Sequence, residues 1–272
     1  MSPDVGELNM EVLEEQLHSD TDQTLELMAN MVHATDPVLR AKAKRLAASL
    51  IVHISRESRV GTSGGSRLAP SRAEHDIDVD SSLEAIIGAR AEGVAPNLED
   101  LFARSWTRPP LAIALVIDAS GSMKGSRLAA ASMLAAAVSL KAPSEHAIIS
   151  FAKTPHVIRE ITSPMQPEEA VDRVLSLRGH GVTGLRGALD AAREQLARSK
   201  AGRKVVLLMS DCRATDDEDP LPAALALPIL RIVAPFEDSD EAAAFAAKTN
   251  ARWAAPETIA QLPNVVRQLM DQ

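Results

Sequence analysis

From residue 111 onward, short apolar segments of strand length alternate with longer segments that have helical spacing. "LAIALVID" (111–118) and "KVVLLMSD" (204–211) are almost continuously apolar, and each ends in an aspartate. Strands that are apolar on both faces have to be covered on both faces, and the intervening helices can supply the cover. The alternation therefore predicts an α/β fold over residues 110–272, with a doubly wound, mostly parallel, Rossmann-like sheet.

Two of the predicted strands are joined too closely for a helical crossover. "HAIISFA" (146–152) and "HVIREI" (156–161) are linked by the tight turn "KTP". A turn of this length favours a hairpin. We therefore expect one short antiparallel edge strand beside the parallel sheet.

The residues before 110 have a different pattern. Residues 1–58 show apolar positions at helical spacing, acidic up to residue 36 and basic on one face after Pro37, and they predict a mainly helical amino-terminal region. The acidic and basic segments can pair internally or form a face for a partner. Residues 59–109 predict a linker with a short strand and a helix that packs on the main domain, ending near two consecutive prolines.

Three aspartates alternate with apolar residues at 76–80, a pattern with two interpretations. A calcium-binding loop requires glycine at its sixth position and glutamate at its twelfth, where this chain has Ser81 and Ile87. The better interpretation is a half-buried strand followed by a helix, with Ser81 and Glu84 as a capping box.

Composition and charge limit the class of function. The net charge is −8, and aromatic residues make up 2% of the chain, so a phosphate-tracking or base-stacking surface is disfavoured. The single cysteine, Cys212, excludes an intramolecular disulfide and suits a reducing compartment. No apolar run is long enough to span a bilayer, and no basic-then-apolar leader opens the sequence. We expect a cytoplasmic protein without nucleic-acid or membrane partners.

Side chains with oxygen atoms follow the central strands. Asp118, Ser120 and Ser122 alternate directly after the first strand, and Asp211 ends the second apolar strand. Between them, Thr183 lies in a glycine-rich stretch that precedes a helix. In parallel sheets, ligands bind beyond the carboxyl ends of the strands. These five residues are therefore candidate ligands at one edge of the sheet.

Two carboxylates and three hydroxyls are the donor set of a hard divalent cation, Mg²⁺ or Mn²⁺, rather than zinc. The carboxylates balance the charge of the ion, and the hydroxyls add none, so the ion can still accept an acidic side chain from a partner protein. Asp and Ser after a strand can instead cap the next helix, which is predicted over residues 125–141. The additional presence of Thr183 and Asp211, in this order, favours the metal site.

The segment from about 110 to 272 resembles the von Willebrand factor A (vWA) domain family. "DASGSM", "GVTGLRGALD" and "LLMSDCRATDDED" are similar to the three segments that form the metal-ion-dependent adhesion site (MIDAS) of that family. The resemblance implies that Asp118, Ser120, Ser122, Thr183 and Asp211 are the metal ligands. The family commonly has glycine after the final aspartate, where this chain has Cys212. A buried structural role for that cysteine is favoured over a redox sensor.

The stretch "AEHDIDVDSSLEAIIGARAEG" before the vWA-like segment is similar to bacterial intracellular vWA proteins related to the magnesium-chelatase D subunit and to CoxE. This resemblance implies a MoxR-type AAA+ ATPase as partner. The chain itself has no G-x-x-x-x-G-K-[ST] motif, so ATP hydrolysis would come from a separate chain. We expect a metal-dependent protein-interaction module that is not an enzyme. The alternative is a Mg²⁺-dependent phosphoryl or ester hydrolase, although Ser120 stands where dehalogenase-type phosphatases have a second aspartate.

Overall fold

The computed structural model describes residues 16, 19–32, 37–57, 67–72, 77–107, 110–121, 123, 125–179 and 181–270. The chain forms two compact units. The first comprises Met1–Thr62 together with Leu111–Gln272, and the second comprises Ser63–Pro110. The amino-terminal helices therefore belong to the same unit as the α/β domain, and we call this unit the α/β unit.

The α/β unit is built on a six-stranded sheet in the order β5-β4-β3-β6-β7-β8. Neighbouring strands are parallel, except that β5 runs antiparallel to β4 at one edge. This confirms the predicted mostly parallel sheet and its single antiparallel hairpin. The strands are β3 (Leu111–Asp118), β4 (His146–Phe151), β5 (Pro155–Arg159), β6 (Arg203–Met209), β7 (Leu230–Val233) and β8 (Arg252–Ala254).

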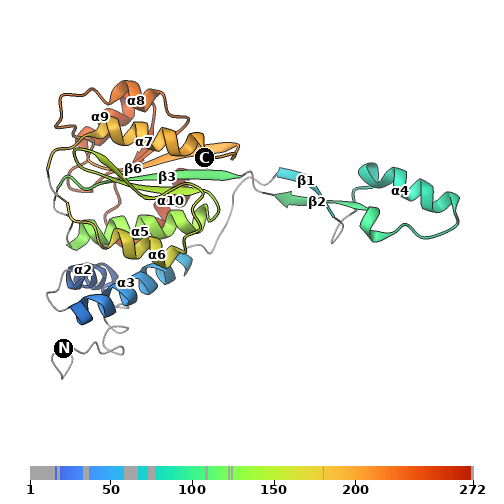
Figure 1. Ribbon diagram of the computed structural model, residues 1–272, viewed down its shortest axis with the longest axis horizontal. Helices are drawn as coiled ribbons and strands as arrows, with labels where there is room; N and C mark the ends of the chain where they lie inside the picture. The colour runs from blue at the N-terminus through green and yellow to red at the C-terminus, as the bar shows by residue number, and fades with distance from the viewer. Residues whose placement is uncertain are drawn as a thin grey trace. The chain divides into compact units, whose positions relative to one another are not determined.

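Helices cover both faces of this sheet (Figure 1). One face is covered by α5 (Gly125–Lys141), α6 (Pro167–Val174) and α10 (Leu262–Met270), and the other by α7 (Leu185–Ala197), α8 (Leu221–Leu225) and α9 (Asp240–Thr249). Side chains of β3 alternate between the two cores. Ile113, Leu115 and Ile117 face the α5 side, whereas Ala112 and Val116 belong to the core on the α7 side. Burial on both faces explains why β3 is apolar throughout.

Two further helices form an additional layer over α5 and α6. They are α2 (Thr21–Met31) and α3 (Pro37–Glu57), and Leu25, Met28 and Ile51 contribute to the core that they share with α5. This confirms that the amino-terminal region is helical. The helix α3 begins at Pro37, where proline suits the first turn because its missing N–H needs no partner there.

Polar contacts fix this layer in place. The basic face of α3 forms ion pairs with α6, between Lys44 and Asp172 and between Arg56 and Glu168. These basic residues of α3 are therefore paired internally, but their acidic partners come from α6 and not from the acidic amino-terminal segment. In addition, Asn30 of α2 accepts a hydrogen bond from the backbone N–H at the first residue of α5.

The second unit contains an antiparallel pair of strands, β1 (Arg67–Arg72) and β2 (Phe102–Thr107), the helix α4 (Val79–Ala91) and a short 3-10 helix, η1 (Leu98–Asp100). The strand expected at 76–80 and the capping box at Ser81 are wrong. Asp78 is the N-cap of α4, because its carboxylate accepts hydrogen bonds from the backbone N–H and the hydroxyl of Ser81. Aspartate and serine cap equally well, so the residue types alone did not decide between the two positions.

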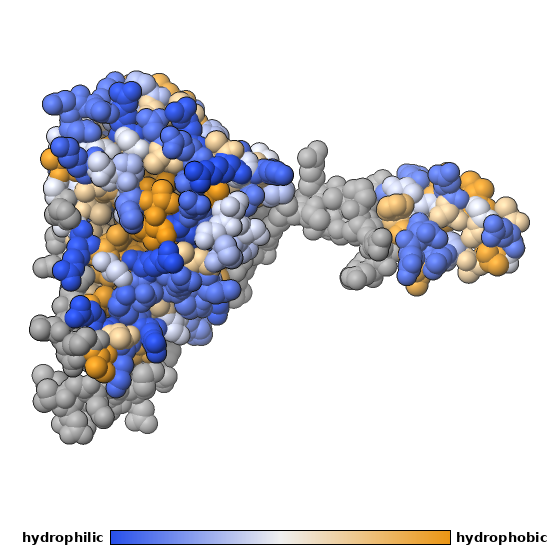
Figure 2. Space-filling model, in the orientation of Figure 1, coloured by the Kyte–Doolittle hydropathy of each residue, from blue (hydrophilic) through white to orange (hydrophobic). Residues whose placement is uncertain are grey.

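Large apolar side chains stay exposed on the second unit. Val79, Leu83 and Ile87 of α4 are exposed, and Figure 2 shows orange surface over this helix. Within the described ranges, no helix combines the length and the apolar character that crossing a membrane requires.

Candidate metal centre

The two predicted aspartates follow neighbouring strands. β3 and β6 pair in parallel, with Ile117 opposite Met209 at the carboxyl end of the ladder. Asp118 is the last residue of β3, and Asp211 follows β6 by two positions. Because parallel strands end at the same edge of a sheet, both aspartates come out at the edge where ligands bind in such folds.

The carboxylate of Asp118 is buried, with 9% of the residue exposed, and it is held by hydrogen bonds from both sides. Its Oδ1 accepts from the backbone N–H of Ser120 at 3.0 Å and from the Ser120 hydroxyl at 2.6 Å. Its Oδ2 accepts from the Ser210 hydroxyl at 2.7 Å. The first two predicted ligands are therefore in direct contact. Ser210 was not predicted from the sequence, and its position directly before Asp211 in "MSD" is the signal that points to it.

The loop with Thr183 lies against the other two loops. The Thr183 N–H donates to Thr215 Oγ1 at 2.8 Å, and the Thr215 N–H donates to the Thr183 carbonyl at 3.2 Å. At the start of this loop, a Cβ on Gly179 would overlap the carbonyl oxygens of Gly121 and Ala119, so only glycine permits this approach. Buried Thr183 is thereby connected to the loop after β6 and, through Gly179, to the loop after β3.

Cys212 follows Asp211 in a left-handed backbone conformation with φ of 63°. Glycine adopts this conformation without strain, which gives a structural reason for the glycine that the vWA family commonly has at this position. The cysteine is buried, and its N–H donates to Ser210 Oγ at 2.9 Å. Burial is the main cause that raises the pKa of the Cys212 thiol to about 12, and the negative charges of Asp211 and Asp118 add to it. The sulfur therefore stays protonated and does not add a thiolate to the site.

Four of the five predicted ligands lie in the described residues, and Ser122 lies outside them. Asp118 and Ser120 are hydrogen-bonded to each other, while Thr183 and Asp211 are on the two loops that Thr215 connects. Over the described ranges, no three His, Cys, Asp or Glu side chains are grouped as in a typical metal site. A cation here would therefore depend on hydroxyl ligands, and the all-oxygen donor set fits a hard divalent ion.

Comparison with protein families gives one match. The model of the family described as VWA domain containing CoxE-like protein matches residues 42–228. No curated protein matches the sequence.

Several solved structures match parts of the chain. The vWF domain of the type V pili tip protein Mfa5 from Porphyromonas gingivalis is 25% identical, with 40% of each chain covered and a TM-score of 0.35. A von Willebrand factor type A structure from Catenulispora acidiphila is 16% identical over 62% of this chain and 43% of the other, with a TM-score of 0.48. Manganese-loaded TRAP protein from Plasmodium vivax is 16% identical over 60% of this chain and 72% of its own, with a TM-score of 0.49. The matched part thus spans less than half of the first two structures.

Proposed function

Since the chain belongs to the family of VWA domain containing CoxE-like proteins, we propose that it is a metal-dependent protein-interaction module. In this proposal, a divalent cation, Mg²⁺ or Mn²⁺, is held by Asp118, Ser120, Ser122, Thr183 and Asp211. When bound, the ion supplies an electrophilic position for an Asp or Glu side chain of a partner protein. A directional bond of this kind gives specificity without a large apolar interface.

One observation carries the proposal. The two hydrogen bonds between Thr183 and Thr215 hold the threonine loop beside the loop that contains Asp211. Both loops lie at the sheet edge where Asp118 ends β3. A helix cap would require only Asp118 and the serines, so the capping alternative gives no reason for the third loop to be there.

The proposed partner is a MoxR-type AAA+ ATPase in a bacterial cytoplasm. This part of the proposal is supported by the similarity of residues 73–93 to CoxE-like and chelatase-related vWA proteins and by the absence of a P-loop motif from the sequence. The module binds and does not catalyse. An assay for phosphate-ester hydrolysis with Mg²⁺ tests this statement, because turnover above background would favour the hydrolase alternative.

A pair of substitutions at Thr183 tests the metal site. Thr183→Val removes the hydroxyl but keeps the side-chain shape and both backbone hydrogen bonds to Thr215. Thr183→Ser keeps the hydroxyl and is the matched control. Calorimetric titration with Mg²⁺ and with Mn²⁺ should give binding by the wild type and by Thr183→Ser, and binding by Thr183→Val weakened about tenfold, a change of about 1.4 kcal/mol. Equal affinity of all three proteins would contradict the assignment of Thr183.

The partner is tested with the same variants. The MoxR-type ATPase from the native organism should be retained by the immobilised wild type in Mg²⁺ and released by a chelator. The Thr183→Val protein should retain less of the ATPase than Thr183→Ser under the same conditions. Retention that is unaffected by chelator would show that the interaction does not use the metal.

A further inference from the structure

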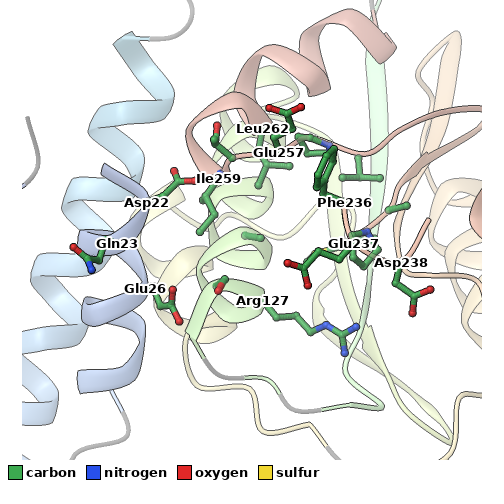
Figure 3. Close-up of a pocket in the computed structure, with 18 of the residues that line it drawn as sticks. Asp22, Gln23, Glu26, Arg127, Phe236, Glu237, Asp238, Glu257, Ile259 and Leu262 are labelled. Atoms are coloured by element: carbon green, nitrogen blue, oxygen red, sulfur yellow. Dashed lines mark hydrogen bonds between the residues drawn. The ribbon is translucent and has the colours of Figure 1, made fainter. Parts of the chain in front are cut away.

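A cleft of about 830 Å³ lies beside the candidate metal centre, within the α/β unit. Figure 3 shows its walls. They are formed by α2, the first turns of α5, the loop after β7, and the segment leading through η2 (Ile259–Gln261) into α10. The metal site described above does not use this cleft.

The inner surface of the cleft is apolar. It is lined by side chains from β6, β7, η2 and the start of α10, among them Met209, Val233, Ile259 and Leu262. Phe236 lies in the loop after β7 and is 55% exposed. A large exposed aromatic ring beside an apolar surface is typical of a contact site.

The lining is also strongly acidic. Arg127 is the one cationic side chain among the described residues that line the cleft, against six carboxylates, namely Asp20, Asp22, Glu26, Glu237, Asp238 and Glu257. Some of these carboxylates serve the fold: Asp22 accepts the backbone N–H groups of Ile259 and Ala260, and Asp238 forms an ion pair with Arg213.

Three carboxylates remain available for a ligand. Glu26, Glu237 and Glu257 form no ion pair or side-chain hydrogen bond with any of the residues that the structure describes. Glu26 comes from α2 and Glu237 from the opposite wall, and Arg127 lies between these walls at the base of the view in Figure 3. The cleft thus combines an apolar lining with carboxylates that have no ion-pair partner among the described residues, and its charge is complementary to a cationic ligand.

The cleft is continuous with the loops of the metal site. A Cβ on Gly121 would lie 2.5 Å from the Arg127 guanidinium, so Arg127 reaches the loop that follows Asp118. On the other side, the Asp238–Arg213 ion pair connects the cleft wall to the loop that follows Asp211. A protein segment that reaches the metal is therefore close enough to reach the cleft as well.

We propose that this cleft binds an arginine or lysine side chain of the protein whose carboxylate binds the metal. The aliphatic stem of the side chain contacts the apolar lining, and its charged end reaches Glu26 and Glu237. The exposed ring of Phe236 adds a cation–π contact. The binding of the cationic side chain follows from the cleft alone, and only the identity of the partner rests on the proposed function. The partner is then recognised by an acidic and a basic side chain together.

The test uses the full chain and a fluorescein-labelled Leu-Arg-Leu-Arg-Leu peptide, with a second peptide that has citrulline in place of both arginines. Binding is followed by fluorescence anisotropy in EDTA, so that no metal contributes. The arginine peptide should bind, and its affinity should fall as salt is added. The citrulline peptide should bind about tenfold more weakly or not at all. Absence of binding, or equal binding of both peptides, would overturn the proposal.

Two matched pairs of variants locate the binding. The double variant Glu26→Gln and Glu237→Gln should lower the affinity for the arginine peptide about tenfold. The control Glu194→Gln and Glu241→Gln changes the net charge equally at two exposed glutamates that do not line the cleft, and it should have little effect. Phe236→Ala should weaken binding several-fold, whereas Leu225→Ala, at an equally exposed apolar residue, should not. Equal losses in test and control variants would show nonspecific attraction to an acidic surface and would contradict the proposal.

The two proposals fail in different measurements. If the peptide binds the cleft in EDTA but titration shows no Mg²⁺ or Mn²⁺ binding, the metal proposal is wrong and the cationic site remains. If metal binds and the peptide does not, the cationic site is wrong and the metal proposal remains.

Discussion

The strand β3 and the helix α4 are both rich in large apolar residues, but the structure treats them differently. Every residue of β3 after Leu111 is buried, whereas Ser82 is the one buried residue of α4 over Val79–Ala91. Val79, Leu83 and Ile87 of α4 are 58%, 49% and 58% exposed. Their spacing of four residues places them on one side of the helix. The same residue types therefore form a core in one unit and a surface stripe in the other.

The difference lies in what surrounds each segment. β3 lies between two layers of helices, which bury both of its faces. The second unit supplies a two-stranded sheet and a short 3-10 helix beside α4, and Leu101 is the one large apolar residue that is buried among residues 77–102 of that unit. An apolar segment thus indicates burial only when the rest of the domain supplies enough cover. We infer that most of the stability of the chain resides in the α/β unit.

Truncation of a β3 side chain should have the largest effect. Leu115→Ala removes a fully buried side chain and leaves a cavity, which should lower the free energy of unfolding of the α/β unit by about 2–5 kcal/mol. In a Trp106→Phe background, the fluorescence of Trp253 reports on this unit during urea denaturation. A loss below about 1 kcal/mol would show that β3 is not the stabilising centre that its burial indicates.

Acid should weaken the α/β unit. His146 at the start of β4 is buried and contacts Ser139 Oγ and the Ala142 carbonyl. Burial, with a smaller contribution from the positive charge of Arg159, lowers the pKa of His146 from 6.5 to about 4. His146 therefore becomes protonated near pH 6.5 in the unfolded chain but only near pH 4 in the folded chain. Lowering the pH from 7 to 5 should cost about 2 kcal/mol of stability.

A substitution pair checks the origin of this pH dependence. In His146→Asn, the loss of stability between pH 7 and 5 should be smaller, because the titrating group is gone. His156→Asn removes an exposed histidine of the same hairpin and should leave the loss unchanged. The second unit has one histidine, His75, which lies outside the described residues, so the prediction is made for the α/β unit alone. An unchanged pH dependence in His146→Asn would show that His146 is not its source.

The sequence predicted the α/β unit well because its signals are local and strong. The helix predicted at 125–141 is found at Gly125–Lys141, and both apolar strands are central in the sheet. It did not predict β1, because "RLAPSR" contains a proline and no alternation of apolar residues. The short helix α8 was also missed, since five residues are too few to show helical spacing.

At the candidate site, the contact that the sequence predicted best is one between residues that are close together in the chain. Asp118 and Ser120 are two residues apart and are hydrogen-bonded as a turn would place them. The contribution of Thr215 depends on a contact with a residue far away in the sequence, and threonine occurs commonly in loops, so nothing distinguished it. Ser210 contacts the distant Asp118, and its position directly before Asp211 was the one signal for it. The cleft was also not predicted, because its walls come from both ends of the chain.

The smallest effect is expected from the exposed stripe of α4. Leu83→Ser removes an apolar side chain that is half in solvent and leaves no cavity, so the free energy of unfolding of the second unit should change by about 0.5 kcal/mol or less. In a Trp253→Phe background, Trp106 reports on this unit. Serine is a weaker helix former than leucine, and Leu83→Ala, which does not weaken the helix, separates propensity from packing. A cost for Leu83→Ala near that of Leu115→Ala would break the comparison, because only a side chain that is covered in solution loses packing of that size.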